Sequence, residues 1–291
     1  MSSRTLLNLT LVLVAISLGL VVFYKPGIEP PPVPQAITAL DPETVSSIHI
    51  TRTVREPLSF TRHEDSWMLA GDPELPASEF QIPSLLSILQ TATTRSYPAA
   101  ALDLEAAGLE PPQAILTLDD MVFSIGLTAA LDNKRYIQLE DTVYLVDDKY
   151  QHLLNGGRTN FISRKLLPAN SRLTRLQLPD KTLSLTGDGQ WQLTPEDPAV
   201  STADIQALVK NWKNGRATYV KNYDGAATTA TITLETSDSA RPVTLHIIRK
   251  SPEFILARPD WGIQYHLQDS LGNILLDIPL PAPDTNTASE D

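Results

Sequence analysis

The chain has 291 residues, a formal net charge of −11 and a sequence pI near 4.9. This acidic balance opposes binding to nucleic acid and adhesion to anionic lipid headgroups. The sequence contains no cysteine, which excludes disulfides, thiolate metal sites and a cysteine nucleophile.

The amino-terminal segment has the composition of a membrane-spanning helix, because residues 5–24 carry no charge and are mostly apolar. At ~1.5 Å per residue, twenty residues span ~30 Å, the thickness of a bilayer core. A cleaved signal peptide is the alternative, but the run ends in Val22-Phe23-Tyr24-Lys25 with no small-x-small cleavage site. We therefore expect residues 1–25 to be an uncleaved anchor that crosses the membrane at 6–24, with the folded part outside the cytoplasm.

A spacer and a tail flank the part that is expected to fold. Residues 26–36 are rich in proline, which favours a stiff polyproline II segment over a helix. Residues 281–291 are rich in Pro, Thr, Asp and Glu, a composition typical of a disordered tail. About 245 residues lie between them, enough for two domains of ordinary size.

Those residues repeat one pattern, which predicts two modules at 37–167 and 168–280. Each copy has a polar hairpin turn followed by a tryptophan, Trp67 in the first and Trp191 in the second. Some fifteen residues later, apolar residues recur at helical spacing, over 82–89 and over 205–212. Start signals precede both helices, Ser78-Glu79-Phe80-Gln81 and Ser201-Thr202-Ala203-Asp204, although Pro83 indicates that the first helix begins at Ile82 or Pro83.

After each helix the apolar spacing changes to alternation, which is typical of antiparallel strands with one buried face. Four strands are predicted in each copy, at 114–118, 122–125, 135–139 and 143–146 in the first, and at 230–234, 243–247, 253–257 and 263–267 in the second. The fold class is therefore α+β: an amino-terminal transmembrane helix followed by two duplicated modules, each an antiparallel sheet packed by one main helix.

The first copy also carries a turn with a distinctive sequence, Asp103-Leu104-Glu105-Ala106-Ala107-Gly108-Leu109-Glu110-Pro111-Pro112. Gly108 can take a positive φ and end a short helix at 103–107, and the prolines favour an extended backbone before the strand at Ala114. A binding role for this loop is the alternative to a plain turn.

This turn, Ile125-Gly126 and Val143-Tyr144-Leu145-Val146 together resemble the DUF4340 family of bacterial envelope proteins, mainly over residues 60–165. The second copy has Tyr223-Asp224-Gly225-Ala226 where the turn should be, so any role tied to the turn belongs to the first copy. The resemblance implies no established catalytic residues. Together with the expected anchor, it places the folded part in the periplasm at the bacterial inner membrane. Some members of the family are encoded beside ABC-type transport components that resemble gliding-motility auxiliary proteins.

The residues that an enzyme or metal site would use are few and scattered. The sequence has none of the nucleophile, phosphate-loop, zinc or dinucleotide motifs. His63-Glu64-Asp65 offers metal ligands but is expected to be a solvated turn. His246 and His266 are predicted on the polar side of the second sheet, where they would bind a metal only as near neighbours.

The carboxylate pairs Asp119-Asp120 and Asp147-Asp148 follow strands, where aspartate favours turns and caps over the facing pair that a glycosidase needs. Trp67 and Trp191 are interpreted as equivalent core residues, with sugar stacking as the alternative. No catalytic, cofactor-binding or metal-binding residue is assigned, and no cofactor is expected.

We therefore expect a non-enzymatic, membrane-anchored interaction or scaffold protein with an envelope partner. The resemblance makes that partner an ABC-type transporter or its auxiliary subunit. The alternative is a binding module for an envelope polymer or small ligand, with its site in a groove between the modules. A groove lined by aromatic residues would favour the alternative, and an exposed apolar patch on one sheet would favour a protein partner. An enzyme is the third possibility.

Overall fold

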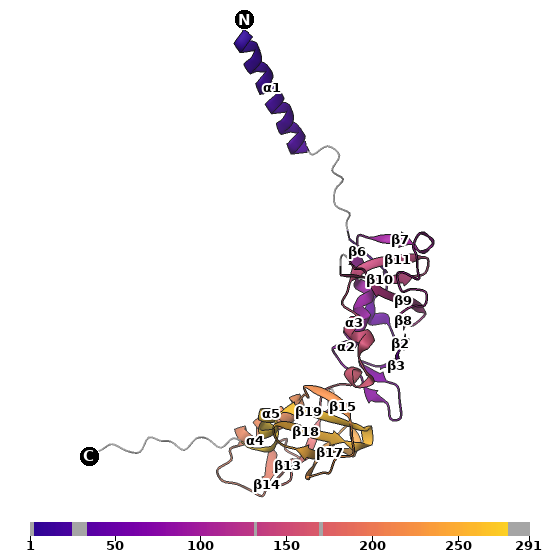
Figure 1. The fold of residues 1–291 in the computed structure, drawn as a ribbon. Helices are drawn as coiled ribbons and strands as arrows, with labels where there is room; N and C mark the ends of the chain where they lie inside the picture. The colour runs from indigo at the N-terminus through magenta and orange to yellow at the C-terminus, as the bar shows by residue number, and fades with distance from the viewer. Residues whose placement is uncertain (1–2, 25–33, 131–132, 169–170, 279–291) are drawn as a thin grey trace, which may run out of the picture.

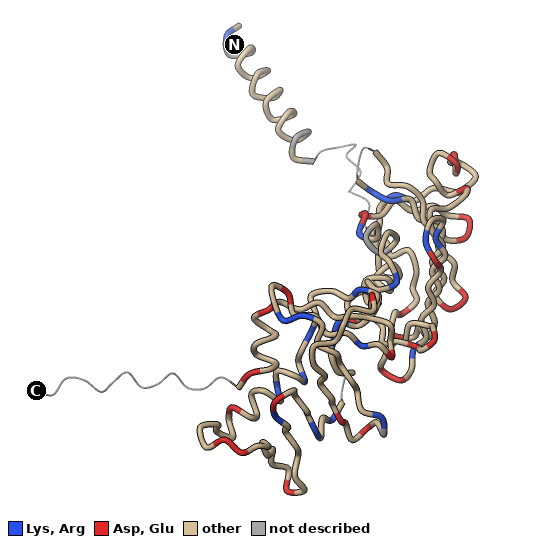
Figure 2. The backbone as a smooth tube through the Cα atoms, turned by 60° about the horizontal axis from the view of Figure 1, so that its bottom comes forward, with Lys and Arg blue, Asp and Glu red and all other residues tan. Residues whose placement is uncertain are grey.

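The computed structural model describes residues 3–24, 34–130, 133–168 and 171–278. Two large antiparallel sheets follow one another along the chain, and an amino-terminal helix, α1 (Ser3–Tyr24), stands apart from both (Figure 1). Acidic residues lie on the loops of both sheets (Figure 2). The observed class is α+β, as predicted.

The first sheet contains nine strands built from residues 47–147. In spatial order they are β5 (Leu75–Pro76), β4 (Ser66–Leu69), β3 (Arg55–His63), β2 (Ser47–Arg52), β8 (Ala114–Leu118), β9 (Met121–Thr128), β10 (Lys134–Leu139), β11 (Thr142–Asp147) and β7 (Ser96–Pro98). Burial alternates along the central strands, as in Ser47–Arg52, because one face packs on the core and the other faces solvent. The four strands predicted in this copy are β8 to β11.

The second sheet contains eight strands with the same connectivity. In spatial order they are β14 (Trp191–Thr194), β13 (Thr182–Leu185), β12 (Leu173–Gln177), β16 (Ala230–Thr236), β17 (Ser239–Arg249), β18 (Glu253–Arg258), β19 (Ile263–Gln268) and β15 (Tyr219–Asn222). Each sheet therefore has a hairpin carrying a tryptophan, a helix that crosses to the far edge, and a four-strand meander. The repeated sequence pattern corresponds to a repeated strand order.

The helices differ more than the strands do. The first is α2 (Gln81–Leu86) continued by the 3₁₀ turn η2 (Ser87–Gln90), so it begins earlier than the predicted Ile82 or Pro83 and loses α geometry before Leu89. Ser78 Oγ accepts long hydrogen bonds of 3.4 and 3.3 Å from the amides of Phe80 and Gln81. The second, α4 (Thr202–Asn214), has the predicted capping box between Ser201 and Asp204.

A shorter helix follows the last meander strand of each sheet, α3 (Gln151–Asn155) in the first and α5 (Asp269–Leu276) in the second. Trp212 of α4 is fully buried and donates its indole N–H to the carbonyl oxygen of Leu275 in α5, at 2.7 Å. The remaining elements are β1 (Gln35–Ala36) paired with β6 (Ala92–Thr93), and the 3₁₀ turns η1 (Pro42–Thr44), η3 (Ala99–Ala101), η4 (Arg158–Phe161) and η5 (Pro259–Trp261).

The predicted short helix at 103–107 is wrong, because these residues form consecutive turns and no helix. Gly108 does take a positive φ of 65°, as predicted. The turn lies against β9, where the amide of Leu127 donates to the carbonyl oxygen of Ala107 at 2.8 Å. A Cβ at Gly126 would overlap that carbonyl oxygen, so the glycine allows the close approach of two backbones.

The anchor and its flanking segments were predicted at 1–25, 26–36 and 281–291. Residues 6–24 do lie in one helix, α1, whose large apolar side chains are exposed. No helix within the described residues has both the length and the apolar content needed to cross a membrane, so the predicted transmembrane span is not supported. Residues 26–33 of the predicted spacer and the whole tail lie outside the described residues, and Gln35–Ala36 at the end of the predicted spacer form strand β1 instead.

Candidate binding site at the junction of the two sheets

The segment between the sheets, residues 161–167, is bonded to both of them. On the first side, the amide of Ser78 donates to the carbonyl of Phe161 at 2.7 Å, and that of Ser163 donates to the carbonyl of Pro76 at 2.8 Å. On the second side, the amide of Leu166 donates to the carbonyl of Gly215 at 3.0 Å. Because both sets of bonds involve one short segment, it fixes how the two sheets meet.

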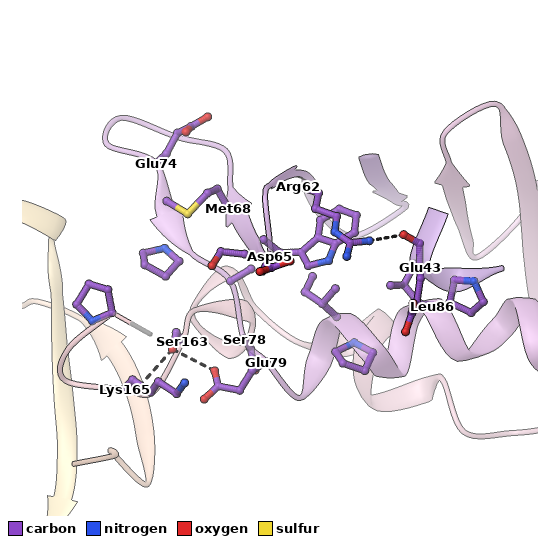
Figure 3. A pocket seen from close by; sticks show the side chains of 18 of the residues that line it. Glu43, Arg62, Asp65, Met68, Glu74, Ser78, Glu79, Leu86, Ser163 and Lys165 are labelled. Atoms are coloured by element: carbon purple, nitrogen blue, oxygen red, sulfur yellow. Dashed lines mark hydrogen bonds between the residues drawn. The ribbon is translucent and has the colours of Figure 1, made fainter. Parts of the chain in front are cut away.

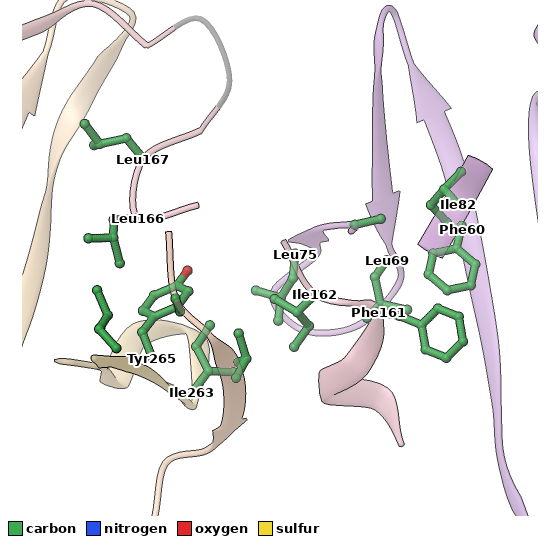
Figure 4. Close-up of a cluster of buried hydrophobic side chains, with 14 of the residues drawn as sticks. Phe60, Leu69, Leu75, Ile82, Phe161, Ile162, Leu166, Leu167, Ile263 and Tyr265 are labelled. Carbon is green, nitrogen blue, oxygen red and sulfur yellow. The ribbon is translucent and has the colours of Figure 1, made fainter. Parts of the chain in front are cut away.

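Apolar packing continues through this segment (Figure 4). Phe161 packs against Phe60 of β3, with ring centroids 5.6 Å apart. Leu166 lies on the other side with Tyr265 of β19, and all four side chains are buried. The hydrophobic core therefore runs from one sheet into the other.

One ion pair crosses the junction. Arg216, in the loop after α4, contacts the carboxylate of Glu79, in the loop before α2. The Arg216 guanidinium also lies 5.1 Å from the centre of the Phe80 ring, a cation–π contact. Ser163 Oγ donates to Glu79 at 3.1 Å, so side chains from both sheets and the connecting segment meet at one carboxylate.

A cavity of about 890 Å³ opens beside this ion pair (Figure 3). Its volume is near the upper end for ligand pockets, and such sites commonly lie between domains. Its apolar lining includes residues of β4, α2, the connecting segment and η5, among them Trp67, Met68, Ile82, Pro83, Leu86, Leu167 and Trp261. The first sheet supplies most of this lining, and the second supplies Trp261.

Trp261 is held in place by its neighbours. The guanidinium carbon of Arg258 lies 3.2 Å from the centre of the indole, and Arg258 Nε lies 3.4 Å from the Asp260 carboxylate. Burial lowers the pKa of Arg258 and raises the pKa of Tyr265, which lies beside it, to about 12. Tyr265 is therefore neutral at physiological pH. Arg258 stacks on the indole of Trp261, which lines the cavity, and Asp260 pairs with Arg258.

The polar lining of the cavity is mostly acidic. Five carboxylates, Asp41, Glu43, Asp65, Glu74 and Glu79, face two cationic side chains, Arg62 and Lys165. Arg62 donates to the backbone carbonyls of Glu43 and Glu64, so its hydrogen bonds are not made to a carboxylate. The site therefore combines an apolar lining with excess negative charge.

None of the three histidines singled out in the sequence lines this cavity. His63 is exposed at the end of β3, beside the hairpin turn. His246 and His266 lie on β17 and β19, which are separated by β18. Within the described residues, no group of three or more His, Asp or Glu side chains is arranged to hold a metal ion.

The prediction that His266 is solvated is wrong. It is 3% exposed, because β19 is covered on both faces and the Tyr219 ring stacks on the imidazole at 4.5 Å. Its Nδ1 lies 2.8 Å from Glu253 and its Nε2 lies 3.0 Å from Gln264. Since both ring nitrogens are occupied, this geometry offers no free nitrogen to a substrate.

Three of the four aspartates in these pairs make structural contacts, and Asp120 is exposed. Burial opposes ionisation of Asp119, but hydrogen bonds from Ser46 and Ser47 outweigh it and lower the pKa of this carboxyl. Lys134 bonds to Asp147 at 2.8 Å and lowers its pKa, although Asp147 is largely exposed. Asp148 forms a buried ion pair with Arg135 at 2.8 Å, and its pKa is also lowered.

Trp67 and Trp191 are half-buried at the margin of the core, so their interpretation as equivalent core residues holds only in part. Trp67 lines the cavity, whereas Trp191 does not. Trp261, Arg216 and Lys165 were not among the residues predicted from the sequence. Trp261 does stand out when the two copies are compared, because the corresponding turn of the first copy, Glu140-Asp141, has no aromatic residue.

The comparisons with known proteins bear on this arrangement. The family model described as "Domain of unknown function (DUF4340)" matches residues 67–235, more than half of the chain. The chain belongs to the DUF4340 family. The match begins at Trp67, beside the cavity, and extends through the connecting segment into β16 of the second sheet. Neither curated proteins nor solved structures give a match to this DUF4340 chain.

Proposed function

We propose that this DUF4340 protein is a non-enzymatic binding protein of the bacterial envelope and that its binding site is the junction cavity. The observation that carries the proposal is a large cavity with Trp67 and Trp261 on its walls, formed where two sheets and their connecting segment meet. The cavity lies between the modules, where the binding-module alternative placed its site, and we propose that a protein partner, rather than a polymer or small ligand, occupies it.

The polar clusters outside the cavity support a binding role over catalysis. Both nitrogens of His266 are engaged, Asp119 is occupied by Ser46 and Ser47, and Asp148 is paired with Arg135. A general base needs a lone pair within reach of a substrate proton. These three groups use their lone pairs in hydrogen bonds and an ion pair within the folded protein.

We also propose that α1 holds the protein at the inner membrane, with the two sheets on the periplasmic side. The helix has 22 residues, ~33 Å at ~1.5 Å per residue. Its leucines, such as Leu6 and Leu13, are more than half exposed, which costs free energy in water and favours burial in lipid. Carbonate extraction and a reporter fused after Asp291 test this part, since a reporter active only in the cytoplasm would contradict it.

The partner proposed here is an envelope protein, and the family resemblance makes an ABC-type transporter or its auxiliary subunit the first candidate. Full-length protein, purified in mild detergent from its own host, should retain that partner. Ser66→Trp places an indole at an exposed position of the cavity wall. Gln190→Trp is the matched control, because Gln190 precedes Trp191 as Ser66 precedes Trp67 and does not line the cavity.

We expect the Ser66→Trp protein to lose the partner and the Gln190→Trp protein to keep it. Thermal unfolding of both variants should stay near that of the parent, because both positions are exposed. A partner that stays bound to a folded Ser66→Trp protein would rule out the cavity as its site.

A further inference from the structure

The charges around the junction cavity indicate what class of ligand it accepts. This inference rests on the proposed function, because it concerns the same cavity. Of its seven charged lining residues, five are acidic and two are basic, a formal net charge of −3. Like charges gathered around an apolar surface repel one another, and a ligand of opposite sign relieves that repulsion.

Three of the carboxylates are free to act on a ligand. Glu79 is already paired with Arg216, and Asp41 accepts the amide of Glu43 at 3.0 Å. Glu43, Asp65 and Glu74 are exposed, and none of the three makes an ion pair with another described residue.

These three carboxylates come from separate elements and are spread across the cavity. Glu43 lies in η1, Asp65 at the tip of the β3–β4 hairpin, and Glu74 in the loop before β5. Figure 3 shows Met68 between Glu74 and Asp65, and Leu86 near Glu43 on the opposite side. A single small cation would meet one of these carboxylates, whereas a chain with several separated cations would meet them all.

Apolar surface lies between the acidic positions. Trp67 and Met68 are half-buried, so each still presents part of its side chain to the cavity. Trp261 faces them from the second sheet. A ligand that matches this lining has large apolar groups placed between its cations, because each type of group then meets its complement.

We infer that the junction cavity binds an extended polypeptide segment of a partner protein in which lysine or arginine residues are interspersed with large apolar residues. The apolar side chains contact Trp67, Met68 and Trp261, and the basic side chains pair with Glu43, Asp65 and Glu74. An anionic polymer is disfavoured by the same charges. Binding weakens as salt rises, because the three carboxylates are exposed and their interactions are screened.

The probe is a synthetic ten-residue peptide of lysine, leucine and phenylalanine, titrated calorimetrically into full-length protein in nonionic detergent with a detergent-only blank. Two comparison peptides replace every lysine with glutamate, or every apolar residue with serine. The test variant is Glu43→Gln/Asp65→Asn/Glu74→Gln. The control is Glu105→Gln/Glu140→Gln/Glu196→Gln, which removes three exposed carboxylates away from the cavity.

We expect the basic apolar peptide to bind, and both comparison peptides to bind at least tenfold more weakly. The test variant should weaken binding roughly tenfold, which corresponds to about 1.4 kcal/mol, because three exposed ion pairs are lost together. The control should stay within about twofold of the parent.

Failure of the basic apolar peptide to bind would overturn the inference. Equal binding of the glutamate peptide, equal binding of the serine peptide, or an unchanged test variant would overturn it as well. The proposed function is judged separately by Ser66→Trp. If that variant loses the partner while the charge tests fail, the cavity is the site and its ligand is of another class.

Discussion

At equivalent positions of their sheets, the first sheet buries an ion pair and the second buries a phenylalanine. Arg135 in β10 corresponds to Phe254 in β18. Ile137 pairs with Ile125 of β9 as Leu256 pairs with Ile247 of β17, and Arg135 and Phe254 each lie two residues earlier in their strands. Arg135 bonds to Asp148 and to the carbonyl oxygen of Gly126. Phe254 is fully buried, and a Cβ at Gly272 of α5 would overlap its ring.

The difference follows from what covers each sheet. The second sheet has the longer helices α4 and α5, which bring Trp212 and Leu275 together over the strands. The first sheet has shorter helices, and Pro83 within α2 lines the cavity. One strand order therefore supports two different coverings, and the junction cavity takes most of its lining from the first sheet.

The largest expected effect is on the closed core of the second sheet. Trp212→Ala should lower the free energy of unfolding by about 4 kcal/mol, because it empties a fully buried site and leaves the carbonyl of Leu275 without its donor. Trp67→Ala should cost about half as much, since Trp67 is half-buried. Urea unfolding of both proteins measures the difference, and equal losses would mean that the two tryptophans are equally buried.

The buried ion pair of the first sheet is expected to matter next. Arg135→Met leaves the buried Asp148 carboxylate without its cation, although Thr128 still donates to it, and this should cost about 3 kcal/mol. The double change Arg135→Met/Asp148→Leu should recover much of that loss, since it makes the site apolar as in the second sheet. A double variant less stable than the single one would show that the first sheet does not accommodate apolar side chains at this site as the second sheet does.

A smaller effect is expected where the turn at 103–112 meets β9. Gly126→Ala should lower the free energy of unfolding by about 2 kcal/mol, because its Cβ would overlap the carbonyl oxygen of Ala107. The corresponding residue of the second sheet is Ile248. Ile247 pairs with Ala230 as Ile125 pairs with Ala114, and Ile248 follows Ile247 as Gly126 follows Ile125. Ile248→Ala should cost less than 1.5 kcal/mol by the same measurement, because this side chain is only half-buried.

Much of each sheet could be predicted because its strands alternate and its hairpin turns are polar. The meander strands and the capping box at Ser201 follow from local pattern alone. The first helix was harder to place, since Pro83 is tolerated in the first turn of a helix that begins at Gln81.

The junction could not be predicted in the same way, because its contacts join residues far apart in the sequence. Glu79 and Arg216 form a pair only because residues 161–167 bond to both sheets. His266 alternates with apolar residues as a solvated side chain would, yet Tyr219 of a sequence-distant edge strand covers it. When another element covers the second face of a strand, the alternation of apolar residues in that strand's own sequence does not show it.

The smallest expected effect on stability is at two carboxylates, Glu253 and Asp147, which both have a lowered pKa. The hydroxyl of Tyr219 lowers the pKa of Glu253, with further contributions from His266 and Arg249. Lys134 lowers the pKa of Asp147. The ordinary pKa is 4.5 for Glu253 and 3.8 for Asp147. Because the pKa is lower in the folded protein, each ionised carboxylate stabilises the fold at a pH above its ordinary pKa. That contribution is lost as the pH falls through the lower pKa of the folded protein.

Glu253→Gln and Asp147→Asn should therefore both unfold at slightly lower temperature than the parent at pH 7, and the difference should shrink as the pH falls below these values. Salt separates the two. The main partner of Glu253 is a neutral hydroxyl, so its contribution should persist in 0.5 M salt (roughly a 4–5 Å Debye length), whereas that of the exposed Lys134–Asp147 pair should vanish. A Glu253→Gln difference that disappears in salt would show that His266 and Arg249, not Tyr219, hold this carboxylate.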